Sequence, residues 1–280
     1  MTVEEEKKTV KDVYAKIAEE YDTRIPGREC PADHKFSATE MKFILDRVSP
    51  RDSVLDIGCG TGRFTIPMAE KVSHIVGFDM SEAMLTQAQD KAKKAGVDSK
   101  TTFQRGDAEK LPFESETFDV VTSMLALMHM PVEIRPAVFA EASRVLKPGG
   151  CMLIGVKNGI FERLSHADRF ASIDIADVDK KKLIFTDTQI GEVLEAPWYS
   201  FTPQELDKLF WTVGMKITYI RGNIPFLALL SDEVAAHGKW FTETLGALED
   251  ILGDVPPFNY FGYYLLVEAV KPLTSSKRDR

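Results

Sequence analysis

A glycine-rich run, VLDIGCGTGRF from Val54 to Phe64, joins a short apolar segment to a tight turn. Gly58, Gly60 and Gly62 carry no side chain, so the backbone there can turn sharply and approach a ligand closely. A lone acid, Asp79, ends the next apolar run, HIVGFD, and its carboxylate can accept hydrogen bonds from both hydroxyls of a ribose. This spacing predicts a nucleoside ligand across the carboxyl edge of a parallel sheet.

The turn departs from the dinucleotide fingerprint G-x-G-x-x-G at its third glycine. The pattern here is G-x-G-x-G, and Arg63 stands where the fingerprint has its last glycine. A pyrophosphate at the start of the next helix is therefore disfavoured relative to a nucleoside without phosphates. A nicotinamide-dependent dehydrogenase shares the glycine turn and the distant acid, and it stays open as an alternative.

Three further motifs follow in order: GFDMSEAML, GDAEKLPFESETFDVV and LKPGG. Together with VLDIGCGTG they resemble the four ordered motifs of class I S-adenosylmethionine-dependent methyltransferases, above all the type 11, ubiquinone-methyltransferase-like branch. The match runs from Tyr14 to Val156. The resemblance implies S-adenosylmethionine as cofactor, S-adenosylhomocysteine as product and a Rossmann-like methyltransferase fold.

For the methionine end of the cofactor, the resemblance implies four residues. The backbone of Gly58 and Gly60 would hold this end, and Asp56 would brace the loop or reach the amino group through water. Tyr21, in a Tyr-Asp pair that resembles one folding over the cofactor in this family, would bond the methionine carboxylate. The alternative for Tyr21 is a core tyrosine on an amphipathic helix.

For the adenosine end, the resemblance places Asp79 on the ribose hydroxyls and Met80 on the adenine face. Asp107 would take the adenine amino group beside the backbone of Ala108. An acid after a strand is often only a helix cap, but Ser81 is better placed to cap the helix that follows Asp79. A Gly-Asp pair such as the one at Asp107 is also an ordinary turn signal.

Methyl transfer from a sulfonium is an in-line displacement, which alignment and exclusion of water can accelerate without a base. A base becomes useful when the acceptor is a hydroxyl or a protonated amine. His129, in SMLALMHM just past the fourth predicted strand, lies at the cofactor edge and is the candidate base. The alternative is a histidine in the pocket wall, and His166 is a second, weaker-placed candidate.

Regular alternation of strands and helices predicts an α/β fold with a doubly wound, seven-stranded, mostly parallel sheet. In the resembling family the last strand runs antiparallel between the two before it. Capping boxes predict three helix starts, at Thr2 with Glu5, Ser37 with Glu40 and Thr202 with Glu205. The predicted strands are Ser53 to Ile57, His74 to Phe78, Thr101 to Gln104, Phe118 to Ser123, Cys151 to Val156, Lys216 to Ile220 and Tyr260 to Val270. The first of these capped helices has apolar residues at helical spacing from Val10 to Tyr21. The other predicted helices are Arg63 to Lys71, Glu82 to Ala95, Glu133 to Leu146 and Asp232 to Leu252.

We expect one methyltransferase domain in four parts. Residues 1–36 form a helical cover, 37–157 the cofactor-binding core, 158–200 an inserted lid or substrate segment, and 201–272 the completion of the sheet. A hairpin around TDTQIG predicts strands within the inserted segment, and a solvated connector is the alternative. The residues that could line an apolar acceptor pocket, or simply pack in the core, are Met124, Met128, Met130, Trp198, Tyr199, Phe226 and Trp240. Of these, Met124 is also a candidate cofactor-binding residue.

Composition narrows the classes of partner. The 280 residues carry a net charge of −8, which argues against a broad nucleic-acid surface. Three cysteines lack the spacing of a metal site, the N-terminus lacks a signal peptide and no apolar run could span a membrane. We therefore expect a cytoplasmic monomer or homodimer, without a metal, that methylates a small-molecule acceptor at oxygen, nitrogen or carbon. Two alternatives stay open: modification of a tRNA base or protein side chain with a partner, and a cofactor-binding paralogue without catalysis.

Overall fold

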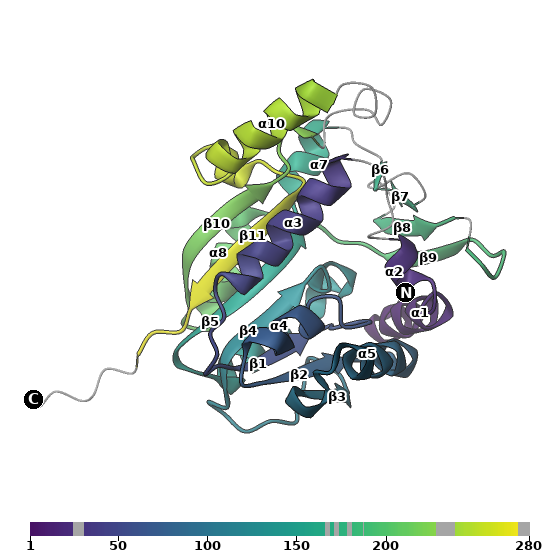
Figure 1. Ribbon diagram of the computed structural model, residues 1–280, viewed down its shortest axis with the longest axis vertical. Helices are drawn as coiled ribbons and strands as arrows, with labels where there is room; N and C mark the ends of the chain where they lie inside the picture. Colours follow the sequence, from purple (N-terminus) through teal and green to yellow (C-terminus); the bar gives the residue numbers. More distant parts are fainter. Residues whose placement is uncertain are drawn as a thin grey trace, which may run out of the picture.

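A seven-stranded sheet runs through the molecule, in the order β10-β11-β5-β4-β1-β2-β3 (Figure 1). The computed structural model describes residues 1–24, 31–165, 169–170, 174–177, 181–186, 188–227 and 239–273. Only the pairs made by β11 are antiparallel, because β11 lies between β10 and β5 and runs against both. The predicted seven-stranded, doubly wound sheet is confirmed. Its strands are β1 Ser53–Ile57, β2 His74–Asp79, β3 Thr101–Arg105, β4 Phe118–Met124, β5 Leu146–Lys157, β10 Lys216–Asn223 and β11 Tyr264–Val270.

Helices cover both faces of this sheet and bury an apolar core on each. Ile44, Met68 and Ala92, from α3, α4 and α5, pack on one face. Phe139 of α6 and Phe210 of α8 pack on the other, with their rings edge to face. The helices are α1 Val3–Lys16, α2 Tyr21–Arg24, α3 Pro31–Leu45, α4 Thr65–Lys71, α5 Glu82–Ala95, α6 Arg135–Val145, α7 Gly159–Ser165, α8 Pro203–Thr212 and α10 Lys239–Leu252, with short turns η1 Asp98–Lys100, η2 Leu127–His129, η3 Val132–Ile134 and η5 Phe258–Tyr260.

Local capping decides where several helices begin and end. The Thr2 hydroxyl accepts from the Glu5 N–H and the Glu5 carboxylate accepts from the Thr2 N–H, so the predicted capping box of α1 is confirmed. Gly96 adopts a left-handed conformation, φ 70°, and ends α5 at the predicted residue. The helix predicted to run to Tyr21 instead ends at Lys16, and α2 starts a new turn.

The predicted helix start at Ser37 and Glu40 is wrong. Helix α3 begins six residues earlier, at Pro31, so both residues lie inside it. Their side chains do not cap the helix but bond Arg63 of the glycine turn, over 2.9 Å to the Ser37 hydroxyl and 3.2 Å to the Glu40 carboxylate. Ser37 and Glu40 have the spacing of a capping box, but both side chains serve a long-range contact with Arg63.

A second, smaller sheet packs beside α1 (Figure 1). Its antiparallel order is β6-β7-β8-β9, and β8 with β9 forms the hairpin predicted within the inserted segment. The strands are β6 Arg169–Phe170, β7 Asp174–Asp177, β8 Lys182–Phe185 and β9 Leu194–Pro197. Tyr199, just after β9, donates its hydroxyl to Glu6 of α1 over 2.8 Å, so the first helix and the inserted segment support each other.

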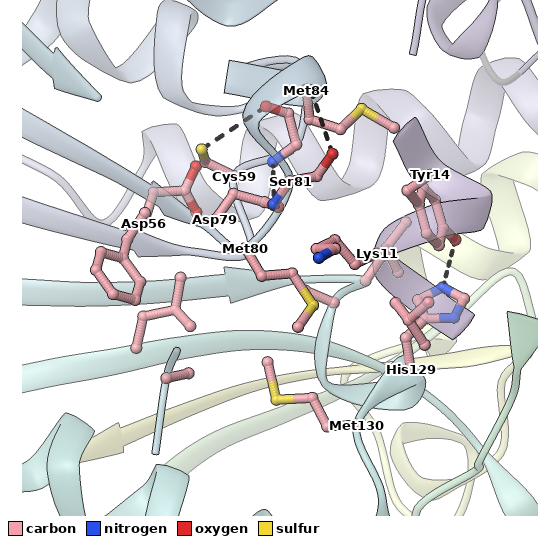
Figure 2. Close-up of a pocket in the computed structure, with 18 of the residues that line it drawn as sticks. Lys11, Tyr14, Asp56, Cys59, Asp79, Met80, Ser81, Met84, His129 and Met130 are labelled. Carbon is pink, nitrogen blue, oxygen red and sulfur yellow. Dashed lines mark hydrogen bonds between the residues drawn. The ribbon is translucent and has the colours of Figure 1, made fainter. Parts of the chain in front are cut away.

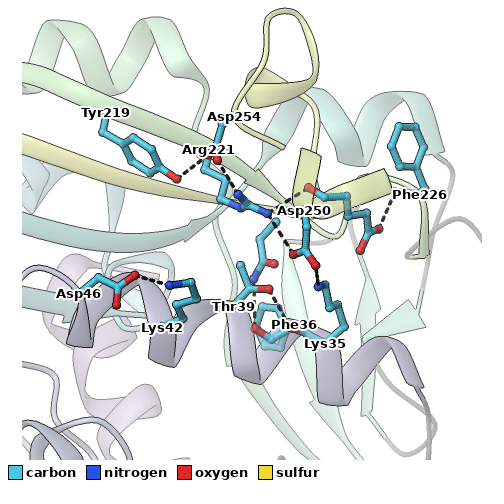
Figure 3. Close-up of polar contacts among 12 residues, drawn as sticks. Lys35, Phe36, Thr39, Lys42, Asp46, Tyr219, Arg221, Phe226, Asp250 and Asp254 are labelled. Atoms are coloured by element: carbon cyan, nitrogen blue, oxygen red, sulfur yellow. Dashed lines mark hydrogen bonds and ion pairs between the residues drawn. The ribbon is translucent and has the colours of Figure 1, made fainter. Parts of the chain in front are cut away.

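Polar contacts fasten α10 to α3 and to the edge strand β10 (Figure 3). Lys35 of α3 pairs with Asp250 of α10 at 2.5 Å, and Arg221 of β10 pairs with Asp254 at 2.8 Å. The backbone N–H of Phe226 donates to a buried glutamate of α10, Glu249. Phe226 therefore lies beside α10. No helix in the part of the chain that the structure describes is long and apolar enough to cross a membrane.

Candidate functional site

A deep cleft opens at the carboxyl edge of the main sheet, between the strand ends and α1 (Figure 2). Its free space, counting the part open to solvent, is about 1120 Å³. Every residue that the sequence predicted for the cofactor lines this cleft, as does the candidate base. These residues are Tyr21, Asp56, Gly58, Gly60, Asp79, Met80, Asp107, Ala108, Met124 and His129.

The glycine turn between β1 and α4 is built on three residues with positive φ, Gly58 at 72°, Gly60 at 53° and Gly62 at 79°. A Cβ on Gly58 would stand 2.2 Å from the Cβ of Ala126, which follows β4. Glycine is required there for both backbone conformation and close approach. The contact fixes the turn against the loop after β4.

Four N–H groups of this turn, those of Gly58, Cys59, Gly60 and Gly62, are hydrogen bonded within the protein. Gly58 and Cys59 both donate to the carbonyl of Phe78, at 2.7 and 3.2 Å, and Gly60 donates to the Asp79 carboxylate at 2.9 Å. A pyrophosphate binds such turns through free N–H groups. What Gly58 and Gly60 can offer a ligand is therefore their carbonyl oxygens, which suit an ammonium group and not a phosphate.

Asp79 is locked in place at the end of β2. One carboxylate oxygen accepts from Gly60 and the other from the N–H of Ser81 at 2.9 Å. The Ser81 hydroxyl caps α5 by accepting from Met84, so Asp79 is not needed as the cap. Burial raises the pKa of Asp79 above its usual value. Each oxygen keeps a second lone pair, so the carboxylate can still accept from a diol in the cleft.

Asp56, at the floor of the cleft, is a bracing residue. Its two oxygens accept from the hydroxyls of Thr65, at 2.6 Å, and Thr122, at 2.7 Å. These bonds tie β1 to α4 and to β4 beneath the turn. Burial raises the pKa of Asp56 to about 6, against the opposing effect of the two hydroxyls.

Asp107 and Ala108 line the cleft where the chain leaves β3, but Asp107 also has a partner that the sequence did not predict. Lys7 of α1 donates to the Asp107 carboxylate at 2.6 Å and also contacts Glu109. These two carboxylates raise the pKa of Lys7 despite its burial. The Lys7–Asp107 pair joins residues 100 positions apart, and no local pattern in the sequence could have indicated it.

Tyr21 and Asp22 fold over the glycine turn from α2. The Asp22 carboxylate accepts from the Thr61 hydroxyl at 2.7 Å and pairs with Lys91 at 2.6 Å. Tyr21 lines the cleft, and burial raises its pKa to about 12, opposed by the positive charge of Arg63. Arg63 lines the same part of the cleft, so a cation stands beside Tyr21.

His129 lies buried at the cleft wall with both ring nitrogens engaged. Its Nδ1 lies 2.9 Å from the carbonyl of Pro197, which can only accept, so Nδ1 carries the proton. Its Nε2 is therefore bare and accepts from the hydroxyl of Tyr14 at 2.7 Å (Figure 2). Burial lowers the pKa of His129 to about 4, so the ring is neutral at physiological pH.

The residues predicted for an acceptor pocket separate into three groups. Met124 and Met130 line the cleft, while Met128 and Trp198 line a second, adjoining chamber. Trp240 is 77% exposed on α10, and Phe226 and Tyr199 line neither cavity. His166 and Cys30 lie outside the described residues. Across the described ranges, no three His, Cys, Asp or Glu side chains are placed to hold a metal ion.

The chemistry of the cleft fits an adenosyl amino acid. Two carboxylates, Asp79 and Asp107, face it as hydrogen-bond acceptors for hydroxyls and an amino group. Met80 and Ala108 add apolar surface to the cleft, and Arg63, which pairs with Glu40, adds a positive charge. The N–H groups of Gly58, Cys59 and Gly60 are engaged within the protein and are not offered to a pyrophosphate.

Comparison with known proteins agrees with this chemistry. Residues 54–150 match a family model described as a methyltransferase domain. The chain is 37% identical over 144 residues to a demethylmenaquinone methyltransferase of Bacillus cytotoxicus, covering 50% of this chain and 59% of that protein. It is 43% identical over 105 residues to the 27-O-demethylrifamycin SV methyltransferase of Amycolatopsis mediterranei, covering 37% and 38%.

The chain thus spans at most about three fifths of these curated relatives. Among solved structures, the complex of DhpI with S-adenosylhomocysteine (SAH) is similar to this chain with a TM-score of 0.61 and 15% sequence identity. The match covers 97% of this chain and 99% of the DhpI chain, so the two proteins share a fold. The family model, the named relatives and the four ordered motifs agree. Residues 54–150 of this chain thus form a methyltransferase domain, similar in sequence to those of the named methyltransferases.

Proposed function

We propose that this chain transfers the methyl group of S-adenosylmethionine to a small-molecule acceptor at oxygen, nitrogen or carbon, by in-line displacement. The observation that carries the proposal is the hydrogen bonding of the glycine turn. The N–H groups of Gly58, Cys59 and Gly60 are bonded to Phe78 and Asp79, while the Asp79 carboxylate is held facing the cleft. Such a turn suits a ribose and an amino acid better than a dinucleotide phosphate.

The proposed roles follow the geometry of the cleft. Asp79 would accept from the ribose hydroxyls beside Met80, and Asp107 with Ala108 would hold the adenine. The carbonyls of Gly58 and Gly60 would face the methionine ammonium. When bound, the cofactor supplies an electrophilic methyl group on a positively charged sulfur.

At the methionine carboxylate, Tyr21 would act together with Arg63, which the sequence analysis did not assign. Met124 would lie below the reacting centre, at the end of β4. Helix α1 covers the cleft on the side away from the strands, and the small sheet packs against α1. Exclusion of water favours the displacement. Residues 158–200 would then serve as the lid that selects the acceptor.

A small acceptor is favoured over a macromolecular one. The net charge of −8 disfavours the phosphate contacts that nucleic-acid binding needs. By their names, the relatives act on demethylmenaquinone and on a demethylated rifamycin, which are small molecules. The described cysteines, Cys59 and Cys151, are free, as is usual in the cytoplasm, where we propose that the protein acts as a monomer or homodimer.

Isothermal titration calorimetry tests the cofactor assignment. We expect SAH to bind with a dissociation constant in the micromolar range or below, and NAD to give no heat of binding. The reverse result would replace the proposal with a dehydrogenase. Binding of SAH without consumption of S-adenosylmethionine, across a panel of phenols, amines and carbon acids, would instead favour the paralogue without catalysis.

A further inference from the structure

Helix α1 reaches the base-binding end of the cleft through Lys7. The side chain of Lys7 is only 10% exposed, and its ammonium donates to the Asp107 carboxylate at 2.6 Å and to the Glu109 carboxylate. In the part of the chain that the structure describes, no other cation lies within ion-pair distance of either carboxylate. Lys7 therefore holds together two acids that would otherwise repel each other.

The two oxygens of the Asp107 carboxylate are fixed in different ways. Oδ1 accepts from the backbone N–H of Glu109 at 3.0 Å, which is a contact within the local turn. Oδ2 accepts from Lys7 at 2.6 Å, which is 100 positions away along the chain. The turn holds one oxygen and α1 holds the other, so the rotation of the carboxylate depends on Lys7. Each oxygen keeps a second lone pair with which it can accept from a ligand.

The ammonium of Lys7 is itself committed to the protein. One of its three N–H groups serves Asp107 and a second serves Glu109, while the Glu4 carboxylate lies 3.6 Å from the same nitrogen. Burial alone would lower the pKa of Lys7, but the hydrogen bonds to Asp107 and Glu109 raise it, so the side chain stays charged. One positive and two negative charges leave Lys7, Asp107 and Glu109 with a net charge of −1. This end of the cleft therefore favours a ligand that donates hydrogen bonds over one that accepts them.

Other contacts keep α1 over the cleft without Lys7. The helix packs against α5 and β9. Glu6 accepts from the Tyr199 hydroxyl at 2.8 Å, and Lys16 pairs with Glu192 at 2.5 Å. We therefore expect the helix to stay in place when Lys7 is replaced, so that only the setting of Asp107 changes.

We propose that Lys7 is a positioning residue for the cofactor base: it sets Asp107 to accept from the amino group of adenine and to reject a base with an oxygen in that place. Adenine carries an N–H donor where hypoxanthine carries a carbonyl acceptor, and an ionised carboxylate can only accept. This inference rests on the proposed function, in which Asp107 holds the adenine. It gives α1 a part in selecting the cofactor, beyond covering the cleft.

Calorimetry with two ligands tests this selection. The ligands are SAH and S-inosylhomocysteine, its deaminated counterpart, which has an oxygen in place of the adenine amino group. In the unchanged protein we expect SAH to bind at least about 30-fold more tightly, the scale of one hydrogen bond to a charged group.

Lys7→Met removes the ammonium and keeps a long, unbranched side chain. It should weaken the binding of SAH about tenfold, because Asp107 is no longer held toward the amino group, and should leave the binding of S-inosylhomocysteine within about twofold. The preference for SAH should therefore fall about tenfold. A purely structural role of Lys7 would weaken both ligands alike and would not move this ratio.

Two further variants serve as controls. Lys16→Met is matched to Lys7→Met, because it removes another lysine ion pair of α1, and Lys16 does not line the cleft. It should leave both affinities within about twofold, since no contact to the base region is lost. Lys7→Arg keeps the charge and the donors, so it should retain most of the preference for SAH.

The outcomes separate this inference from the proposed function. Equal weakening of both ligands by Lys7→Met, or no change in the preference for SAH, would overturn the role of Lys7. If Asp107→Asn loses the preference while Lys7→Met keeps it, the adenine assignment stands without Lys7. If Asp107→Asn keeps it as well, Asp107 does not read the base; and if SAH fails to bind the unchanged protein, it is the proposed function that falls.

Discussion

Replacing Asp79 by asparagine tests the ribose assignment with little change in shape. The carboxylate accepts from Gly60 and Ser81, each at 2.9 Å. In asparagine one of the two terminal groups is an NH₂ that cannot accept, so one backbone bond and one acceptor position toward a diol are lost. A hydrogen bond to a charged group is worth about 1.5–3 kcal/mol, so SAH affinity should fall by ~2 kcal/mol, or about 30-fold.

Stability should fall less than affinity in this variant. Burial raises the pKa of Asp79, which means that the folded protein already disfavours the charged carboxylate. The neutral amide relieves part of that penalty and offsets part of the lost hydrogen bond. We therefore expect the free energy of unfolding to change by under about 2 kcal/mol in the absence of ligand.

Calorimetry with SAH and its 2′-deoxy analogue, together with urea unfolding, measures both effects. Asp119→Asn is the matched control, because Asp119 accepts from Ser53 at 2.9 Å near the start of β4, at the opposite edge of the same sheet. It should leave the affinity unchanged. The reasoning is refuted if Asp79→Asn binds SAH as tightly as the unchanged protein, or if loss of the 2′-hydroxyl weakens binding equally in both.

Three further outcomes follow from the site. Gly58→Ala should lower the stability in thermal unfolding by more than the ~1 kcal/mol that an alanine in the left-handed conformation costs. Adding Ala126→Gly should remove the 2.2 Å contact and restore the stability to within that ~1 kcal/mol of the unchanged protein. The pKa of His129 falls from 6.5 in the unfolded chain to about 4 in the folded protein. The neutral ring therefore stabilises the fold fully above pH 6.5, and this stabilisation is lost as the pH falls toward 4. In urea titrations at pH 7 and pH 5, the free energy of unfolding should drop by ~2 kcal/mol more than it does in His129→Gln. Asp22→Ala, which frees the Thr61 hydroxyl of the turn, should weaken SAH binding about fivefold by calorimetry, and unchanged affinity would show that α2 does not support the turn.

The sequence predicted best where structure is set by neighbours along the chain. The capping Ser81 and the terminating Gly96 gave both ends of α5, because each bonds backbone within a few residues. The positive φ of Gly58 follows equally from the tight turn that the motif requires. The doubly wound, mostly parallel sheet followed from the alternation of elements, and the place of the last strand followed from the family resemblance.

The sequence predicted least where a side chain meets a distant partner. His129 is at the predicted edge, but the orientation of its ring depends on Pro197, 68 residues away, and on Tyr14 of the first helix. The same holds for Glu40, which resembled a capping residue and is instead a buried partner of Arg63, with its pKa raised to about 8 by burial. No local pattern distinguishes these cases, since the deciding atoms are brought near only by the fold.

A crystal structure of the protein with SAH bound tests the central claim most directly. The account predicts the ribose hydroxyls on the Asp79 carboxylate and the adenine beside Ala108 and Asp107. A ligand with its ribose away from Asp79, or with its adenine away from Asp107, would contradict it.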